Sequence, residues 1–387
     1  MSFETFYTVA LPIAAFLIGS CVGSFLNVVI YRVPLGLSVN EPKRSFCPNC
    51  KTQIPAWLNI PLVTWLMLRG KCKWCQVSIS PRYFVVELLT GLLFLAAWKA
   101  FFPEGVDANT DPIIPLQGLF LVLSYWVLLA LLVAATFIDF DHFIIPDSIT
   151  IGGLAVGLMS SVALPQLHGV EGHFESLWMG IVGAAAGFGL LWSVVNLGKL
   201  AFGRLKFEFD EATDWSISQP DPEENPVIRI GEETMSWDEV FYRDSDRLVM
   251  EVTEVTINGE TRDAKDVVIQ GETIKIDEEA FKLEKVKSLS GKCRRATVPR
   301  EAMGFGDVKF IAMIGAFLGW VAVFFTVFAA SIIGAVVGLL QKFVAREDWA
   351  RPLPFGPYLA LGAILWIFMG DAFLAWYLGL VGFGGEG

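Results

Sequence analysis

The chain of 387 residues is too apolar for a soluble globular protein: 54% of its residues are hydrophobic, with 13 Trp and 31 Phe, and its formal net charge is −11. Its mean hydropathy is +0.55, and the apolar residues are gathered in long blocks. This pattern excludes a soluble protein with a single core and predicts an all-α polytopic membrane protein. Membrane lipid is therefore an expected partner, and nucleic acid is not.

Eight apolar blocks are long enough, or nearly so, to be transmembrane helices. The first has only Glu4 ahead of it and is longer than the apolar part of a signal peptide, so we expect it to be retained as a span. The count is about eight, because the fourth and sixth blocks are short. The expected spans are residues 6–31, 84–103, 117–138, 148–164, 177–198, 308–322, 323–341 and 357–380.

Lys and Arg are concentrated in alternate connections between these spans. Eight of them lie in residues 31–82, whereas 104–116 and 165–176 contain none. Connections rich in Lys and Arg remain on the cytoplasmic side of the membrane. We therefore expect both termini to lie outside, and the long connections, which include 199–307, to lie in the cytoplasm.

The acidity of the chain is concentrated in residues 204–300, which contain 23 Asp and Glu against 15 Lys and Arg. Short β-rich runs occur at 227–230, 248–257 and 267–276, and Asn258-Gly259 is a typical hairpin turn. The segment is too polar to span a membrane. It predicts a small β-rich cytosolic insert between the helices.

Two Cys-x-x-Cys pairs lie in the basic connection after the first span. Cys47 and Cys50 form the first pair, Cys72 and Cys75 form the second, and 21 residues separate them. Two such turns can surround one Zn²⁺ with four thiolates, and the metal would supply folding free energy that so short a loop cannot obtain from a core. The alternative is a pair of disulfides, which a cytoplasmic location disfavours.

Two aspartates stand at the ends of expected spans. The third span ends in Ile138-Asp139, and Gly306-Asp307 begins the sixth, with the two aspartates 168 positions apart. In the topology above both lie at the same depth on the cytoplasmic side, where two carboxyls that meet would share one proton. One could then deprotonate a water while the other protonates a peptide carbonyl, as in aspartic proteases. Gly304 and Gly306 favour this interpretation, because residues without Cβ allow another helix to approach closely.

Other interpretations of the acidic residues remain open. Asp307 is equally well explained as a helix cap, and capping is the better explanation for Asp147, which follows Ile145-Pro146. Asp141 is either a solvated loop residue or an aid to the site. Two other classes of protein are a zinc-binding membrane scaffold without catalysis and an ion-coupled transporter. Paired acids at a membrane edge argue against the scaffold, and the spans show few of the polar midpoints that a transporter would need.

Five segments occur in a characteristic order: GSFLNVVIYRVP (23–34), the cysteine loop through SPRYFVVE (47–87), IDFDHFIIPD (138–147), GFGDVKF (304–310) and PFGPYLALG (354–362). In these segments the chain resembles the bacterial type IV prepilin peptidases, which are leader peptidases and N-methyltransferases among the Gly-x-Gly-Asp aspartyl membrane proteases. The resemblance covers most of the chain except 204–300. It implies that the catalytic aspartates are Asp139, which precedes Ile145-Pro146, and Asp307.

The resemblance also implies a function. An enzyme of this kind removes the basic leader from type IV prepilins and pseudopilins on the cytoplasmic side of the bacterial inner membrane, and methylates the new N-terminal residue from S-adenosylmethionine. Pilus or secretion assembly proteins are then expected partners. Glu87 resembles a family glutamate associated with methylation, although a carboxylate near a helix N-terminus is favourable in any case. The chain lacks a dinucleotide-binding glycine fingerprint, so a cofactor pocket must be built in another way.

These observations divide the chain into five expected regions. They are the first span (1–31), a cytoplasmic zinc-binding loop with four cysteines that is also the candidate methyltransferase region (32–83), spans two to five with the first aspartate (84–203), the acidic β-rich insert (204–300), and spans six to eight with the Gly-x-Gly-Asp motif (301–387).

Overall fold

The computed structural model describes residues 6–42, 45–47, 49–102, 116–202, 204–218, 226–241, 246–271, 273–283, 286, 288–299, 304–345 and 353–381. The chain forms two compact units. One contains Met1–Trp192 together with Gly304–Gly387, and the other contains Ser193–Met303.

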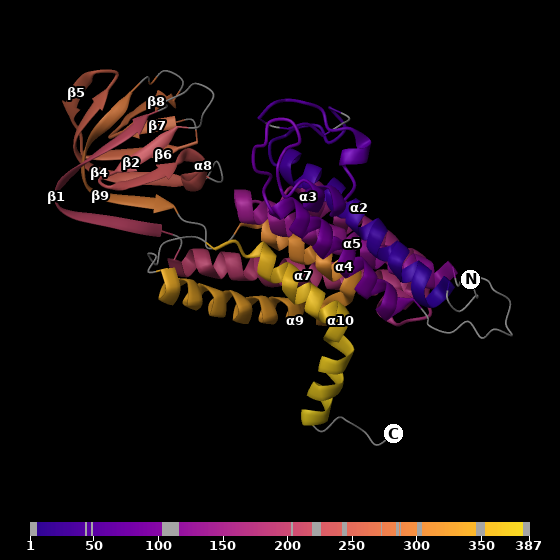
Figure 1. Cartoon of the computed structure of the whole chain (residues 1–387). Coiled ribbons are helices and arrows are strands. Elements are labelled where there is room, and N and C mark those ends of the chain that lie inside the picture. Colours follow the sequence, from indigo (N-terminus) through magenta and orange to yellow (C-terminus); the bar gives the residue numbers. More distant parts are fainter. Residues whose placement is uncertain are drawn as a thin grey trace. The chain divides into compact units, whose positions relative to one another are not determined.

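The first unit is helical, as the composition predicts. Its long helices are α2 (Leu11–Arg32), α4 (Arg82–Phe101), α5 (Leu116–His142), α6 (Asp147–Ala163), α7 (His173–Phe202) as far as Trp192, α9 (Phe305–Ala345) and α10 (Gly356–Leu380) (Figure 1). A short turn of helix, η1 (Phe6–Ala10), directly precedes α2, and three others lie between the long helices: η2 (Ala56–Leu58), α3 (Val63–Met67) and η3 (Pro165–His168).

Within the described residues, six helices are long and apolar enough to cross a membrane. The expected count of about eight differs from this number at two places. The helix over 147–163 is shorter than a full span. The expected spans 308–322 and 323–341 correspond to the two helical parts of α9, which meet at a kink at Gly319 (φ 78°, ψ 175°) and which the count of six takes as one helix. The division into two helices is thus found, but it lies at Gly319 rather than after residue 322, because a positive φ is unstrained at the glycine.

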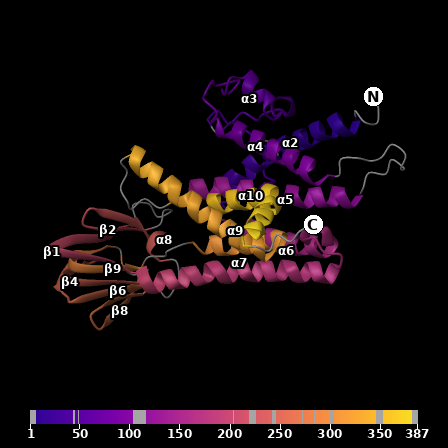
Figure 2. The ribbon, with the colours of Figure 1, turned by 90° about the horizontal axis from the view of Figure 1, so that it is seen from below.

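Helix α5 lies in the interior of the helical unit. It contacts α2, α4, α6 and α10, and α9 packs against α6 and α10 (Figure 2). Leu128, Leu132 and Ile138 of α5 are fully buried. Asp139 follows Ile138 on the side of α5 that faces the neighbouring helices, and it is buried with that side, whereas Phe140 on the other side is 52% exposed.

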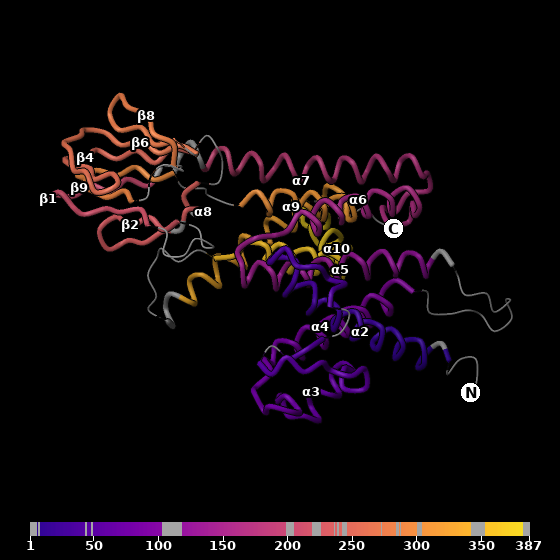
Figure 3. The backbone as a smooth tube through the Cα atoms, turned by 90° about the horizontal axis from the view of Figure 1, so that it is seen from above, coloured from indigo at the N-terminus to yellow at the C-terminus, as the bar shows by residue number. Residues whose placement is uncertain are grey.

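The connection between α2 and α4 folds as a compact loop beyond the ends of these two helices, as Figure 3 shows around α3. It contains all four cysteines of the two Cys-x-x-Cys pairs. The two helices that flank it pack closely on each other. A Cβ atom at Gly23 of α2 would lie 2.7 Å from the Cα of Glu87 of α4, so the helices approach one another at a residue without a side chain.

The second unit is a nine-stranded antiparallel sheet. Its strands are β1 (Arg204–Ser218), β2 (Val227–Ile230), β3 (Glu233–Ser236), β4 (Arg247–Ile257), β5 (Glu260–Asp263), β6 (Asp266–Gln270), β7 (Thr273–Ile276), β8 (Glu279–Lys282) and β9 (Leu289–Pro299), with a short helix α8 (Trp237–Val240) after β3. The order is β3-β2-β1-β9-β4-β6-β7-β8, and β5 pairs with β4. The first and last strands are central neighbours, which brings the two ends of the insert together.

The β-rich character expected for residues 204–300 is confirmed. The run 227–230 is β2, and Asn258-Gly259 is the turn between β4 and β5, with φ values of 51° and 90°. The run 267–276 is not one strand, because it turns at Gly271 (φ 53°) into β6 and β7. Alternation of buried and exposed residues along β4 places one face of the sheet in the core.

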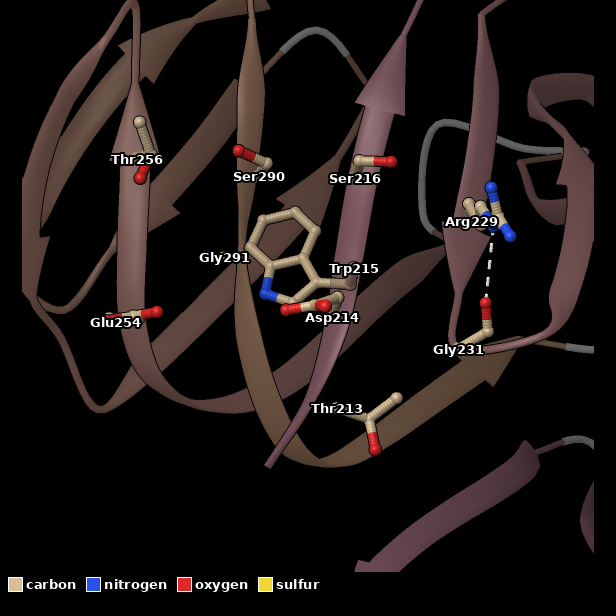
Figure 4. A pocket seen from close by; sticks show the side chains of 10 residues that line it. All are labelled: Thr213, Asp214, Trp215, Ser216, Arg229, Gly231, Glu254, Thr256, Ser290 and Gly291. Atoms are coloured by element: carbon tan, nitrogen blue, oxygen red, sulfur yellow. Dashed lines mark hydrogen bonds between the residues drawn. The ribbon is translucent and has the colours of Figure 1, made fainter. Parts of the chain in front are cut away.

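The outward face of the central strands carries a polar hollow of about 580 Å³ (Figure 4). Trp215, which belongs to the core of the sheet, is one of its lining residues, and most of the others are polar. Two of the charged groups in this region, Glu254 and Lys292, are paired with each other at 3.5 Å. Acidic charge is therefore not concentrated in the hollow. Its lining residues are Thr213, Asp214, Trp215, Ser216, Arg229, Gly231, Glu254, Thr256, Ser290 and Gly291.

Candidate active site and metal centre

Asp139 lies in the last turn of α5, where it is 5% exposed. Its Oδ2 accepts a hydrogen bond of 2.9 Å from the backbone N–H of Gly356, at the start of α10. The first N–H groups of a helix have no acceptor within the helix, so this donor is free to bind a carboxylate. A Cβ atom at Gly356 would lie 2.7 Å from that oxygen, so only glycine allows the contact.

Gly356 is a site residue that the sequence pattern does not single out. The segment 354–362 contributes to the resemblance without a role for any of its residues. A Gly-Pro pair that opens an apolar helix was the available signal, because Pro357 fits the first turn of a helix and the glycine before it leaves its N–H accessible.

Asp307 lies in the first turn of α9 and is 8% exposed. Its Oδ1 is buried and has no hydrogen-bond partner among the described residues. Its carboxylate interacts electrostatically with that of Asp139. The structure thus brings together two acidic side chains that lie 168 positions apart in the sequence. A buried carboxyl oxygen without a partner is exceptional in a folded protein and is typical of a reactive group.

The segment Ile145-Pro146 lies between the two aspartates. A Cβ atom at Gly306 would lie 3.3 Å from the backbone N of Ile145, and one at Gly356 would lie 2.9 Å from its Cδ1. The close approach expected at Gly306 is therefore found, with a loop rather than a helix as the neighbour. Pro146 precedes α6 in an extended conformation. Gly304 is exposed and accepts a hydrogen bond of 3.2 Å from the N–H of Asp307.

Two ion pairs flank the aspartates. Arg82 of α4 binds Asp141 at the end of α5. Lys309 of α9 binds Asp147 of α6, with Nζ and Oδ1 2.6 Å apart. Asp147 is not the N-cap of α6, which is Pro146; it lies in the first turn of the helix, where an acidic side chain is favourable. Asp141 lies in α5 rather than in a loop, and its side chain is 37% exposed and paired with Arg82.

The four cysteines of the loop come together. Their Sγ atoms all lie within 4.8 Å of one another, and those of Cys47 and Cys75 are 3.7 Å apart. Four sulfurs about 2.3 Å from a central Zn²⁺ would be about 3.8 Å from each other in a tetrahedron. All six cysteines of the chain lie among the described residues and are free, so no disulfide joins them.

The two Cys-x-x-Cys turns are copies of one hairpin. The N–H of Cys47 donates to Thr52 O at 3.0 Å and that of Cys72 donates to Val77 O at 2.9 Å; each turn contains a residue of positive φ, Lys51 or Gln76. Such turns direct both thiols of a pair to one side. The donor set therefore fits a metal that prefers four sulfur ligands.

Hydrogen bonds lower the pKa of one of the four thiols, that of Cys75, strongly. The N–H of Val77, the side chain of Asn49 and neighbouring thiols lower the pKa of Cys75 from 9.0 to about 6. A thiolate is the form that binds a metal. Hydrogen bonds from outside the ligand set hold Cys75 in this form at neutral pH.

Glu87 is 9% exposed and holds the cysteine loop against α4. Its Oε2 accepts a hydrogen bond of 2.7 Å from the N–H of Leu62. Leu62 has φ 64° and ψ −52°, and the N–H of Val63 donates to Pro61 O at 2.6 Å. This is a γ-turn of positive φ, which is rare and strained. The helix-terminus explanation for Glu87 is wrong, because no acidic residue lies in the first turn of α4.

The fold and site together define a class: a helical membrane protein with two buried aspartates from distant helices and a four-cysteine loop. Residues 17–101 match the bacterial peptidase A24 N-terminal domain. Residues 126–207 and 292–339 match the type IV leader peptidase family. The unmatched stretch between these last two ranges lies within the β-rich insert.

Curated relatives extend over nearly the whole chain. A prepilin leader peptidase/N-methyltransferase of Aeromonas hydrophila is 30% identical over 94% of this chain and 92% of its own length. One of Stutzerimonas stutzeri is 29% identical over 95% and 94%, and one of Neisseria gonorrhoeae is 38% identical over 50% and 68%. No solved structure matches the chain significantly. The chain belongs to the type IV leader peptidase family.

Proposed function

We propose that this protein is an intramembrane aspartyl endopeptidase that removes the basic leader from type IV prepilins and pseudopilins and N-methylates the new N-terminal residue. The observation that carries the proposal is the meeting of Asp139 and Asp307 in a buried site. Family membership and the name shared by the relatives support the same reaction. Asp139 and Asp307 are the catalytic pair.

The chemistry follows from two carboxyls that share one proton. Like charges in a buried site cannot both ionise at low cost, so one carboxyl stays protonated while the other is a carboxylate. The carboxylate takes a proton from the attacking water, and the protonated carboxyl donates to the carbonyl of the scissile bond. The Gly356 N–H fixes one oxygen of Asp139 during both steps.

The substrate reaches the site along the membrane. A prepilin has a basic leader, then Gly and Phe, then a hydrophobic helix, as the family resemblance implies. Its helix lies among the spans and its leader lies in the cytoplasm, so the Gly–Phe bond arrives at the depth of the aspartates. The enzyme is a multi-pass inner-membrane protein with its site at the cytoplasmic face, its termini outside, and eight membrane segments when α6 and both parts of α9 are counted.

The cysteine loop is the metal centre of the enzyme. Cys47, Cys50, Cys72 and Cys75 hold one structural Zn²⁺, which stabilises a loop that has few buried apolar residues of its own. The methyl donor is S-adenosylmethionine. Glu87, which also accepts a hydrogen bond from Leu62, is the candidate residue that assists the methylation reaction. These roles are distributed over the five regions defined from the sequence, and methylation is assigned to residues 32–83. Pilus or secretion assembly proteins are proposed partners of the insert.

Cleavage of a synthetic prepilin by the purified protein in detergent tests the peptidase assignment. Asp139→Asn and Asp307→Asn should each abolish cleavage and leave membrane insertion intact, because an amide can neither hold the shared proton nor activate water. Asp147→Asn is the control. The Asp147 side chain is 60% exposed, and the substitution removes only its ion pair with Lys309. Substantial cleavage by Asp307→Asn would refute the assignment and favour a scaffold without catalysis.

Elemental analysis of the same preparations tests the metal centre. We expect about one zinc per chain in the wild type and none when Cys47 and Cys72 are both replaced by Ser. A metal-free wild type with four titratable thiols in the loop would exclude the zinc site. Retained zinc in the double variant would place the metal elsewhere.

A further inference from the structure

We propose that Arg82 positions Asp139. It binds the end of α5 at two residues, one before and one after the aspartate. This inference rests on the proposed peptidase function. Arg82 stands at the start of α4, directly after the cysteine loop, and α5 begins more than 30 residues further along the chain. Its role therefore cannot arise from local sequence.

Three contacts join Arg82 to the end of α5. One guanidinium nitrogen forms an ion pair with Asp141. The other donates a hydrogen bond of 3.1 Å to the backbone carbonyl of Phe137. The guanidinium carbon also lies 5.3 Å from the centre of the Phe137 ring. Phe137 and Asp141 lie two residues before and two residues after Asp139, so the fork spans the residue that it positions.

The chemistry of arginine suits this task. The C-terminal end of a helix carries partial negative charge from the helix dipole, so a cation beside it is favourable. A planar guanidinium can bind a carboxylate and a carbonyl at the same time and stack on a ring, whereas an ammonium binds as a point charge. Loss of the fork leaves the end of α5 free to rotate or fray, and a rotation there moves the Asp139 carboxyl directly.

The contacts contribute little to overall stability. The side chains of Arg82 and Asp141 are 30% and 37% exposed, and ion pairs exposed to this degree are typically weak. The atoms that Arg82 binds nevertheless lie on the turn of α5 that carries the buried Asp139 carboxyl, which accepts a hydrogen bond from Gly356. Geometry at the reacting groups, rather than folding free energy, is what the fork controls, and small displacements there are costly to the rate.

Steady-state cleavage of a synthetic prepilin by Arg82→Gln and Arg82→Lys tests the proposal. We expect Arg82→Gln to lower kcat about tenfold to a hundredfold, with KM changed less than about twofold because ground-state binding is untouched. Arg82→Lys should fall between Arg82→Gln and the wild type. The reversed pair, Arg82→Glu with Asp141→Arg, should recover part of the kcat lost by Asp141→Arg alone, because the ion pair is restored without the bond to Phe137.

Arg262→Gln in the insert is the matched control. Arg262 makes the same kinds of contact: an ion pair of 2.7 Å with Glu279 and a ring contact of 5.2 Å with Phe281. All three residues are far from α5 in the sequence. The Arg262→Gln variant should leave kcat unchanged. An unchanged kcat in Arg82→Gln would overturn the proposal. The proposal would also be overturned if the loss of kcat matched the fraction of misfolded protein, measured by gel filtration and thermal midpoint. That result would show that Arg82 has only a structural role.

Hydrogen exchange separates this proposal from the proposed function. In Arg82→Gln, the amides of residues 137–143 should exchange faster than in the wild type, while those in the middle of α5 do not change. A wild-type protein that cleaves no prepilin would refute the peptidase function, and the exchange result would then still decide whether Arg82 holds the end of α5. Equal exchange in the two proteins would overturn the positioning role.

Discussion

Gly356 has no side chain, and the space beside its Cα is taken by the carboxyl of Asp139. A Cβ atom would lie 2.7 Å from Oδ2 and 2.9 Å from Cδ1 of Ile145. Gly356→Ala should therefore displace the aspartate and lower kcat for prepilin cleavage about tenfold to a hundredfold. Gly379→Ala, on the same helix and facing open space, is the control. Equal kcat values in the two variants would show that the contact with Gly356 is not needed.

At the same scale, Asn49 lowers the pKa of one thiol of the proposed metal centre. After the N–H of Val77, its side chain is the largest cause that lowers the pKa of Cys75 to about 6. Cys75 is thus a thiolate above pH 6, and protons compete with the metal as the pH falls below that value. Asn49→Ala should raise the pKa and move the onset of zinc release to higher pH.

A chromophoric chelator that reports free zinc between pH 5 and pH 8 measures this shift. Gln76→Ala is the control, because the Gln76 side chain donates to Lys73 O rather than to a sulfur. We expect it to release zinc as the wild type does. Coincident release curves for all three proteins would remove Asn49 from the metal centre.

At the scale of single elements, the interruption of α9 depends on Gly319. With φ 78° and ψ 175°, this residue occupies a region that is essentially restricted to glycine. Gly319→Ala should cost about 1–3 kcal/mol of stability and lower the thermal midpoint in detergent. Gly152→Ala places a Cβ in open space on α6 and should leave the midpoint unchanged or slightly higher. A Gly319→Ala protein as stable as the wild type would mean that α9 can run through this point as a regular helix.

At the scale of the whole molecule, the insert and the helical unit should be separable. The beginning of β1 and the end of β9 pair from Arg204 with Pro299 to Glu208 with Arg295, so the ends of the insert are held together by its own first and last strands. Replacing residues 210–290 by a flexible Gly/Ser linker should preserve membrane insertion and prepilin cleavage. Loss of insertion in this variant would show that the helical unit needs the sheet.

The charge of the insert adds a second prediction at this scale. An excess of eight acidic groups over residues 204–300 attracts a basic leader, and salt screens such attraction. Raising the ionic strength should increase KM in the intact protein more than in the variant with the linker. Equal salt dependence in the two would leave the insert without a role in leader capture.

Much of this molecule follows from local sequence. The apolar blocks determined the helices, because a chain in lipid must satisfy its backbone groups within each helix. The spacing of the four cysteines determined their convergence, since two short turns can carry two thiols each. The β-rich runs and Asn258-Gly259 determined the character of the insert. In each case the determining residues are neighbours in the chain.

Tertiary structure alone decided the partners of the charged and strained groups. The N–H of Gly356 reaches Asp139, Arg82 binds the end of α5, and Glu87 accepts from Leu62. It also decided that β1 and β9 are neighbours and that α9 is interrupted at Gly319. A residue pattern encodes which faces become buried. A hydrogen bond between distant segments depends instead on the relative depth and rotation of the packed helices, which are fixed only when all the helices are in place.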